Sequence, residues 1–97
     1  MSPQEAYEYA YKNGPSEKTR EIVCQNIIYA YYYAINIDKE SRNNTRNTAC
    51  KNPEYAYLYT RDVDKGFHQD TWNAILNTEY EEKYKAFCNN RMKEEII

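Results

Sequence analysis

Residues 52–66 read NPEYAYLYTRDVDKG and place three tyrosines within five residues. Related stretches begin at Ser2 (SPQEAYEYAYKNG), Asn26 (NIIYAYYYAINID) and Asn77 (NTEYEEKYKAFCN). All four align on a polar first residue and on a tyrosine three positions after a residue that is usually alanine, namely Ala6, Ala30, Ala56 and Glu81. The period is therefore 24 to 26 residues. A fixed period of this length indicates stacked structural repeats.

Each repeat is predicted to contain two short helices. In the first helix, apolar residues recur at the i, i+3, i+4, i+7 spacing of one helical face, as at Ala30, Tyr33, Ala34 and Ile37. The segments EKTREIVCQ, NNTRNTACK and QDTWNAILN align in turn and predict the second helix. Expected N-caps are Ser2, Asn26, Asn52 and Asn77, with Pro3 and Pro53 at the first helical position. Gly14 and Gly66 are expected to close first helices in the left-handed conformation.

The last copy differs from the others in a way typical of a terminal cap. Glu81 and Lys85 stand where the other copies carry alanine or threonine, so one helix face is expected to meet water. The sequence thus predicts an all-α, solenoid-like single domain of about three two-helix units and a capping helix. The predicted units are residues 2–25, 26–51 and 52–76, and the predicted cap is residues 77–97.

Composition limits the possible functions. The 97 residues carry a net charge of −2, which gives no overall attraction to nucleic acid or to an anionic membrane. Three cysteines, one histidine and two glycines form no metal motif, catalytic constellation or phosphate loop, so we expect no enzyme, metal or cofactor. MSPQEAYEYAYKNG lacks the features of a signal peptide, and no run has membrane-spanning length. We expect a cytoplasmic protein with no membrane partner.

The module YAYxYAxxVxxG, best preserved in residues 52–66, resembles short tandem repeats in proteins of large tailed phages and giant DNA viruses. It is also similar to two-helix solenoid repeats such as tetratricopeptide and Sel1 units, although those have longer periods. The resemblance covers nearly the whole chain, but the second copy lacks the glycine. It implies a viral origin, in the host cytoplasm, and an interaction role. It implies no catalytic residues.

The tyrosines divide into columns. Tyr9, Tyr33, Tyr59 and Tyr84 lie in the alanine stripe and are expected to be core residues. A second column flanks the stripe at Tyr29, Tyr55 and Tyr80, and a third lies about 100° away on the other side at Tyr7, Tyr31 and Tyr57. The third column is either an aromatic ladder for a partner or the filling of grooves between helices, and groove filling is favoured.

Two aromatic residues stand outside the columns. Tyr32 occupies a position held by Glu8, Leu58 and Lys83 in the other copies, so it is the expected exposed aromatic residue of the first helices. Trp72 replaces the arginines Arg20 and Arg46. It is either a binding hot spot or a cover for the seam with the last helix.

A basic region runs from Lys39 to Lys51. Within it Arg42 and Arg46 are expected to project together as i, i+4 neighbours, either as a phosphate grip or as a solvated helix face.

The main hypothesis is a non-enzymatic module that binds, and inhibits, a host or viral protein. Its candidate binding residues are Tyr7, Tyr31, Tyr32, Tyr57, Trp72, Arg42 and Arg46. The alternatives are a nucleic-acid binder that uses Lys39–Lys51, a homo-oligomeric structural protein, and a sponge for a small molecule.

Overall fold

The computed structural model describes the backbone of residues 1–96 and side chains through residue 90. The last residue of the predicted cap, Ile97, lies outside the described residues. Over this range the chain is helical and contains no strand, which confirms the all-α prediction. Seven α-helices follow one another: α1 (Pro3–Asn13), α2 (Glu17–Val23), α3 (Ile27–Tyr33), α4 (Asn43–Ala49), α5 (Pro53–Tyr59), α6 (Gln69–Ile75) and α7 (Glu81–Ile96). Two π-helical turns, η1 (Ala34–Asp38) and η2 (Thr60–Asp64), continue α3 and α5.

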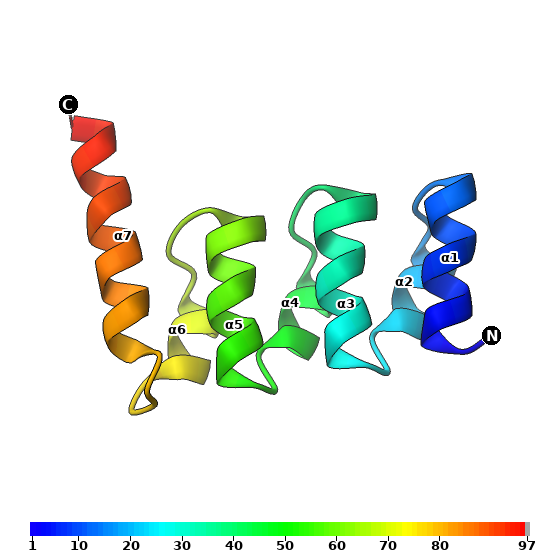
Figure 1. Ribbon diagram of the computed structural model, residues 1–97, viewed down its shortest axis with the longest axis horizontal. Helices are drawn as coiled ribbons and strands as arrows, with labels where there is room; N and C mark the ends of the chain where they lie inside the picture. The colour runs from blue at the N-terminus through cyan, green and yellow to red at the C-terminus, as the bar shows by residue number, and fades with distance from the viewer. Residues whose placement is uncertain (97) are drawn as a thin grey trace.

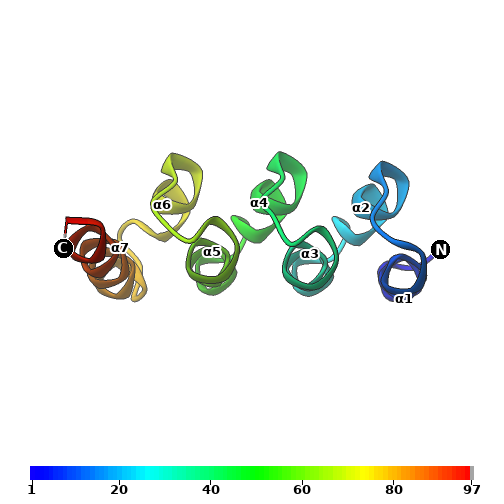
Figure 2. The same ribbon diagram turned by 90° about the horizontal axis from the view of Figure 1, so that it is seen from above.

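The helices form two rows. Helices α1, α3, α5 and α7 stand side by side in one row (Figure 1), and α2, α4 and α6 form the second row behind them (Figure 2). The molecule measures 42 × 29 × 15 Å along its principal axes. Each helical pair therefore packs only against its neighbours in the chain, as in a solenoid.

Side-chain caps start α1, α3 and α5 of the first row. Ser2 forms a reciprocal capping box with Glu5, and the side chains of Asn26 and Asn52 each accept two backbone N–H groups of the first turn. These three N-cap predictions are confirmed. The prediction for Asn77 is wrong: its φ is 65°, and it lies in the turn before α7. Asn tolerates the left-handed conformation that this turn requires.

Neither glycine has the predicted left-handed helical conformation, although Gly14 has a positive φ together with a ψ of 168°. Gly14 follows α1 with a φ of 94°, a value that side-chain-bearing residues rarely adopt. Gly66 does not have a positive φ. Lys39 and Lys65, which directly follow η1 and η2, take the left-handed conformation instead, with φ of 54° and 58°. The π turn therefore places the left-handed residue one position before Gly66.

The core lies between consecutive units, where a tyrosine packs on small residues. Tyr33 packs with Ala6, Ala10 and Val23, and the equivalent clusters contain Tyr59 with Ala34 and Ala49, and Tyr84 with Ala56 and Ile75. These three tyrosines are at most 1% exposed. Alanine lets the helices approach closely, and the ring fills the space between them.

A repeated hydrogen-bond network satisfies each core hydroxyl. The hydroxyl of Tyr33 accepts from the backbone N–H of Ser16, donates to its carbonyl and lies 2.8 Å from Oγ1 of Thr19. Tyr59 bonds in the same way with Arg42 and Thr45. Tyr84 repeats the arrangement with His68 and Thr71. Buried hydroxyls need such partners, so each tyrosine contributes apolar area without an unpaired polar group.

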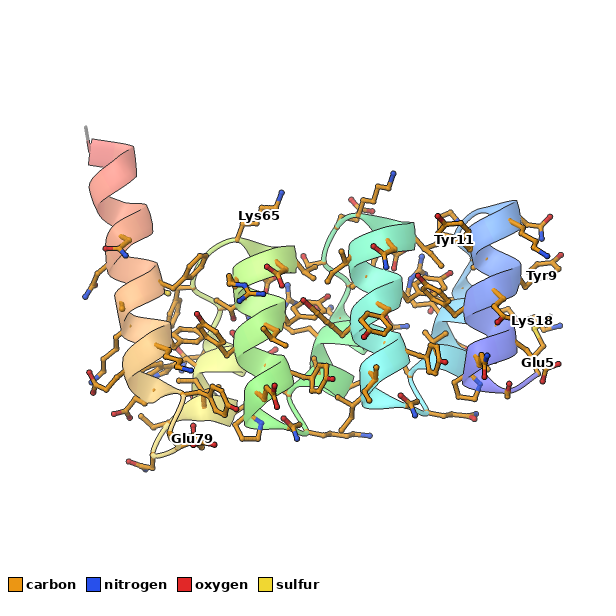
Figure 3. All side chains as sticks on the ribbon, in the orientation of Figure 1. Glu5, Tyr9, Tyr11, Lys18, Lys65 and Glu79 are labelled. Atoms are coloured by element: carbon orange, nitrogen blue, oxygen red, sulfur yellow. The ribbon has the colours of Figure 1, made fainter. Side chains whose placement is uncertain are left out.

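The prediction that Tyr9 is a core residue is wrong, since its side chain is 51% exposed. Tyr9 points away from α3, toward a side on which the described residues contain no further unit (Figure 3). Glu5 and Asn13 replace the Tyr29 and Ile37 of the next unit on this end. The opposite end carries Glu81 and Lys85, which pair at 3.6 Å. Polar side chains therefore lie at both ends of the row, beside the exposed Tyr9 at the α1 end.

Candidate functional site

Arg46, one of the candidate binding residues, is buried. Its guanidinium donates to both carboxylate oxygens of Asp64, at 3.0 and 2.6 Å, and its side chain is 7% exposed. It also lies over the ring of Tyr59, 5.8 Å from the centroid. Hydrogen bonding to Asp64 raises the pKa of Arg46 above its ordinary value. Arg20 and Asp38 form the same pair one unit earlier.

Arg42 does not project with Arg46, so that prediction is wrong. Arg42 precedes α4 with an extended backbone (φ −136°, ψ 147°), outside the helical i, i+4 geometry that the prediction assumed. Its exposed side chain pairs with Glu40 at 2.6 Å. The basic region from Lys39 to Lys51 therefore does not present Arg42 and Arg46 as a joint phosphate grip.

The third tyrosine column joins neighbouring units. Tyr31 is only 6% exposed, and its hydroxyl donates to Asp62 of η2. The half-buried Tyr7 accepts a 3.0 Å hydrogen bond from Asn36 of η1. Burial and Asp62 raise the pKa of Tyr31, while Arg61, and then Tyr31, lower the pKa of Asp62. For Tyr31 the groove-filling interpretation holds, and it is not part of an exposed ladder.

Tyr57, the last member of that column, sits in a different setting. Its ring stacks on Tyr80 of the turn before α7, with centroids 6.2 Å apart. Arg61 lies 5.9 Å from the centroid of Tyr57, and Lys83 lies 5.5 Å from that of Tyr80. The chain's own cations therefore already lie on these two rings.

Trp72 packs on Tyr84 at a centroid distance of 5.4 Å and is half-buried. It occupies the position that Arg20 and Arg46 hold in the earlier units, while Asn89 stands five residues after the core tyrosine, where those units carry the paired aspartate. A shallow hollow of about 170 Å³ beside it is lined by Phe67, Trp72, Tyr84, Lys85, Cys88 and Asn89. The packing supports the seam-cover interpretation of Trp72.

Two of the exposed aromatic residues, Tyr11 and Tyr32, lie at the seam between α1 and α3, while Tyr9 and Phe67 are exposed elsewhere. Tyr32 is 44% exposed, as expected. Its ring contacts Tyr7 and Tyr29, and the three centroids are 5.8 to 6.5 Å apart. The tyrosine groove, an open hollow of about 310 Å³, is lined by Gln4, Tyr7, Glu8, Tyr29, Tyr32 and Asn36.

Tyr11 extends this aromatic surface and was not among the residues predicted from the sequence. It is 69% exposed, lies 6.2 Å from Tyr7 between centroids and is labelled beside the α1–α3 seam in Figure 3. Tyr11 shares its repeat position with Arg61 in one copy and with the apolar Ile35 in another, so comparison between copies gives no clear signal of its exposure.

The remaining reactive groups have structural surroundings. His68 caps α6, its Nδ1 accepting the backbone N–H of Asp70 at 3.1 Å. Cys24, Cys50 and Cys88 are free and half-buried, and burial raises the pKa of Cys50 to about 11. Within the described part of the chain, no three His, Cys, Asp or Glu side chains gather as a metal site requires. None of the described helices has the length and apolarity needed to cross a membrane.

Comparison of the chain with family models, curated proteins and solved structures found no match. Its function is therefore inferred from the geometry of the chain itself.

Proposed function

We propose that the chain is a non-enzymatic module that binds a partner protein on the seam between α1 and α3. The observation that carries this proposal is a tyrosine cluster beside an open groove, in which Tyr11 and Tyr32 are exposed and Tyr7 and Tyr29 are half-buried. Tyrosine is enriched at binding hot spots, because its rigid ring buries a large area and its hydroxyl still bonds to a partner. The buried Tyr31 and Arg46 act within the scaffold in this proposal.

The resemblance of the YAYxYAxxVxxG module extends the proposal to a small viral accessory protein in the host cytoplasm. It would inhibit a host defence protein by covering part of its surface. The polar residues Glu5 and Asn13 at one end, and Glu81 and Lys85 at the other, argue against growth of the solenoid by end-to-end stacking of copies. The seam between α1 and α3 carries the two exposed tyrosines Tyr11 and Tyr32 beside an open groove.

Affinity capture from a nuclease-treated lysate of the cells that naturally make the chain tests this proposal. We expect wild type to capture one protein in stoichiometric amount and the double variant Tyr11→Ser/Tyr32→Ser to lose it. Tyr9→Ser is the matched control, because Tyr9 is also about half exposed but lies on the side of α1 that faces away from α3. Capture that persists in the double variant would place the partner elsewhere. Recovery only without nuclease would favour nucleic acid.

A further inference from the structure

The three rings of the tyrosine groove present aromatic surface in several directions. The ring planes of Tyr7 and Tyr29 are inclined at 52°, those of Tyr7 and Tyr32 at 54°, and those of Tyr29 and Tyr32 at 85°. A group in the groove therefore meets more than one ring. The face of each ring carries negative charge density, which attracts a cation.

Elsewhere in this chain, tyrosine rings hold a cation repeatedly. The pairs are Arg20 with Tyr33, Arg46 with Tyr59, Arg61 with Tyr57 and Lys83 with Tyr80, at 5.5 to 5.9 Å from the ring centroids. In the tyrosine groove no lysine or arginine among the described side chains lines the wall or lies over a ring. The groove thus has the rings of a cation site without a cation from the chain itself.

The polar groups of the groove also select for a cation. Gln4 donates to the carboxylate of Glu8 at 3.3 Å, and Asn36 donates to the hydroxyl of Tyr7. Each bond uses one of the two N–H groups of its amide and leaves the amide oxygen free to accept. Among the described residues, the only charged side chain in the wall is the Glu8 carboxylate, so the charge of the groove favours a cation over an anion.

We infer that the tyrosine groove receives the cationic side chain of a lysine or arginine on a basic segment of the partner protein. This inference rests on the proposed function and names the chemistry of the partner. The cation contacts the rings of Tyr7, Tyr29 and Tyr32, and the Glu8 carboxylate and the amide oxygens accept its N–H groups. The aliphatic stem of the same side chain covers the ring edges.

Titration of the full chain, with tyrosine rings labelled for NMR, tests the inference directly. The probes are Nα-acetyl-lysine methylamide and Nα-acetyl-arginine methylamide, and the neutral control is Nα-acetyl-norleucine methylamide. We expect a saturable shift of the Tyr7, Tyr29 and Tyr32 ring signals with the cationic probes only. The rings of Tyr57 and Tyr80 serve as an internal control, because Arg61 and Lys83 already lie on them.

Two variants sharpen the test, and circular dichroism confirms that each keeps its helicity. Tyr32→Leu keeps apolar bulk but removes one ring, and should weaken binding of the cationic probes about two- to fivefold. Glu8→Gln should weaken it by up to about fivefold, with a smaller loss at high salt. Equal shifts with norleucine, or no shift of the three rings with either cation, overturn the inference.

The outcomes for the two proposals are separable. In one outcome, lysate capture depends on Tyr11 and Tyr32 but the rings do not respond to the cationic probes. This result supports the proposed interaction module and overturns the cation site. A selective cation response without any captured protein overturns the proposed function instead. Choline bound at least about tenfold more tightly than the lysine and arginine probes would indicate a small-molecule site and overturn the basic segment as occupant.

Discussion

The hydroxyl of Tyr59 lies 2.8 Å from Oγ1 of Thr45, although the two residues are on different helices and both are fully buried. The same hydroxyl bonds to the backbone N–H and carbonyl of Arg42. This single hydroxyl therefore holds the segment before α4 in place and links two consecutive repeat units. Because the arrangement recurs at Tyr33 and Tyr84, it is the structural signature of the repeat.

Tyr59→Phe should lower the free energy of unfolding by about 1–3 kcal/mol, because the buried groups of Arg42 and Thr45 lose their partner while the ring remains. Urea denaturation at neutral pH measures the change. Tyr11→Phe is the control, since Tyr11 is 69% exposed, and it should change stability by less than about 0.5 kcal/mol. Equal effects in the two variants would show that the buried network contributes nothing.

Arg46→Met should lower the free energy of unfolding by about 3–5 kcal/mol. The substitution leaves the carboxylate of Asp64, which is 8% exposed, without its cation. The third unit suggests a rescue, since Trp72 and Asn89 stand at the positions of this arginine and aspartate. The double variant Arg46→Trp/Asp64→Asn should recover at least half of the loss in the same urea measurement. If the double variant is as unstable as Arg46→Met, a tryptophan and an asparagine can replace the ion pair only beside α7.

Gly14→Ala should lower the free energy of unfolding, whereas Gly66→Ala should not lower it. Gly14 has a φ of 94°, so alanine there should cost about 1–3 kcal/mol. Gly66 has no positive φ, and a Cβ added to it would have no atom within 4 Å, so alanine should be neutral or stabilise by about 0.4–1 kcal/mol. Thermal unfolding of the two variants side by side checks this. A loss at Gly66 equal to that at Gly14 would contradict the backbone assignment.

Asp62 should make stability depend on acid pH. Arg61, and then Tyr31, hold the pKa of its carboxyl below the ordinary value in the folded chain. The stabilisation is therefore fully present above the unfolded pKa, near about 4, and is lost as pH falls through the lower folded pKa. Wild type should exceed Asp62→Asn in unfolding free energy at about pH 5, and the gap should narrow by about pH 2.5. A gap that stays constant would exclude this ionisation as its source.

The repeat period, the helix pairs, three N-caps and three of four core tyrosines could be predicted from the sequence. Each depends on spacing within one helix or on comparison between copies, and both are visible in one dimension. Tyr9 was misplaced because the same repeat position is buried only when another unit lies beside it, and in the described chain none does. The predicted helix face of Tyr9 is correct, but no neighbouring unit in the described chain covers that face.

The tertiary structure alone decided which polar and aromatic side chains remain free. Arg46 meets Asp64 and Tyr31 meets Asp62 across 18 and 31 residues, through the π turn η2 that no local pattern indicated. These long-range pairs remove two candidate residues from the surface. They leave Tyr32, with Tyr7 and Tyr29, at an open groove. Helical periodicity states which side of its own helix a residue occupies, but burial depends on what the neighbouring helix places opposite it.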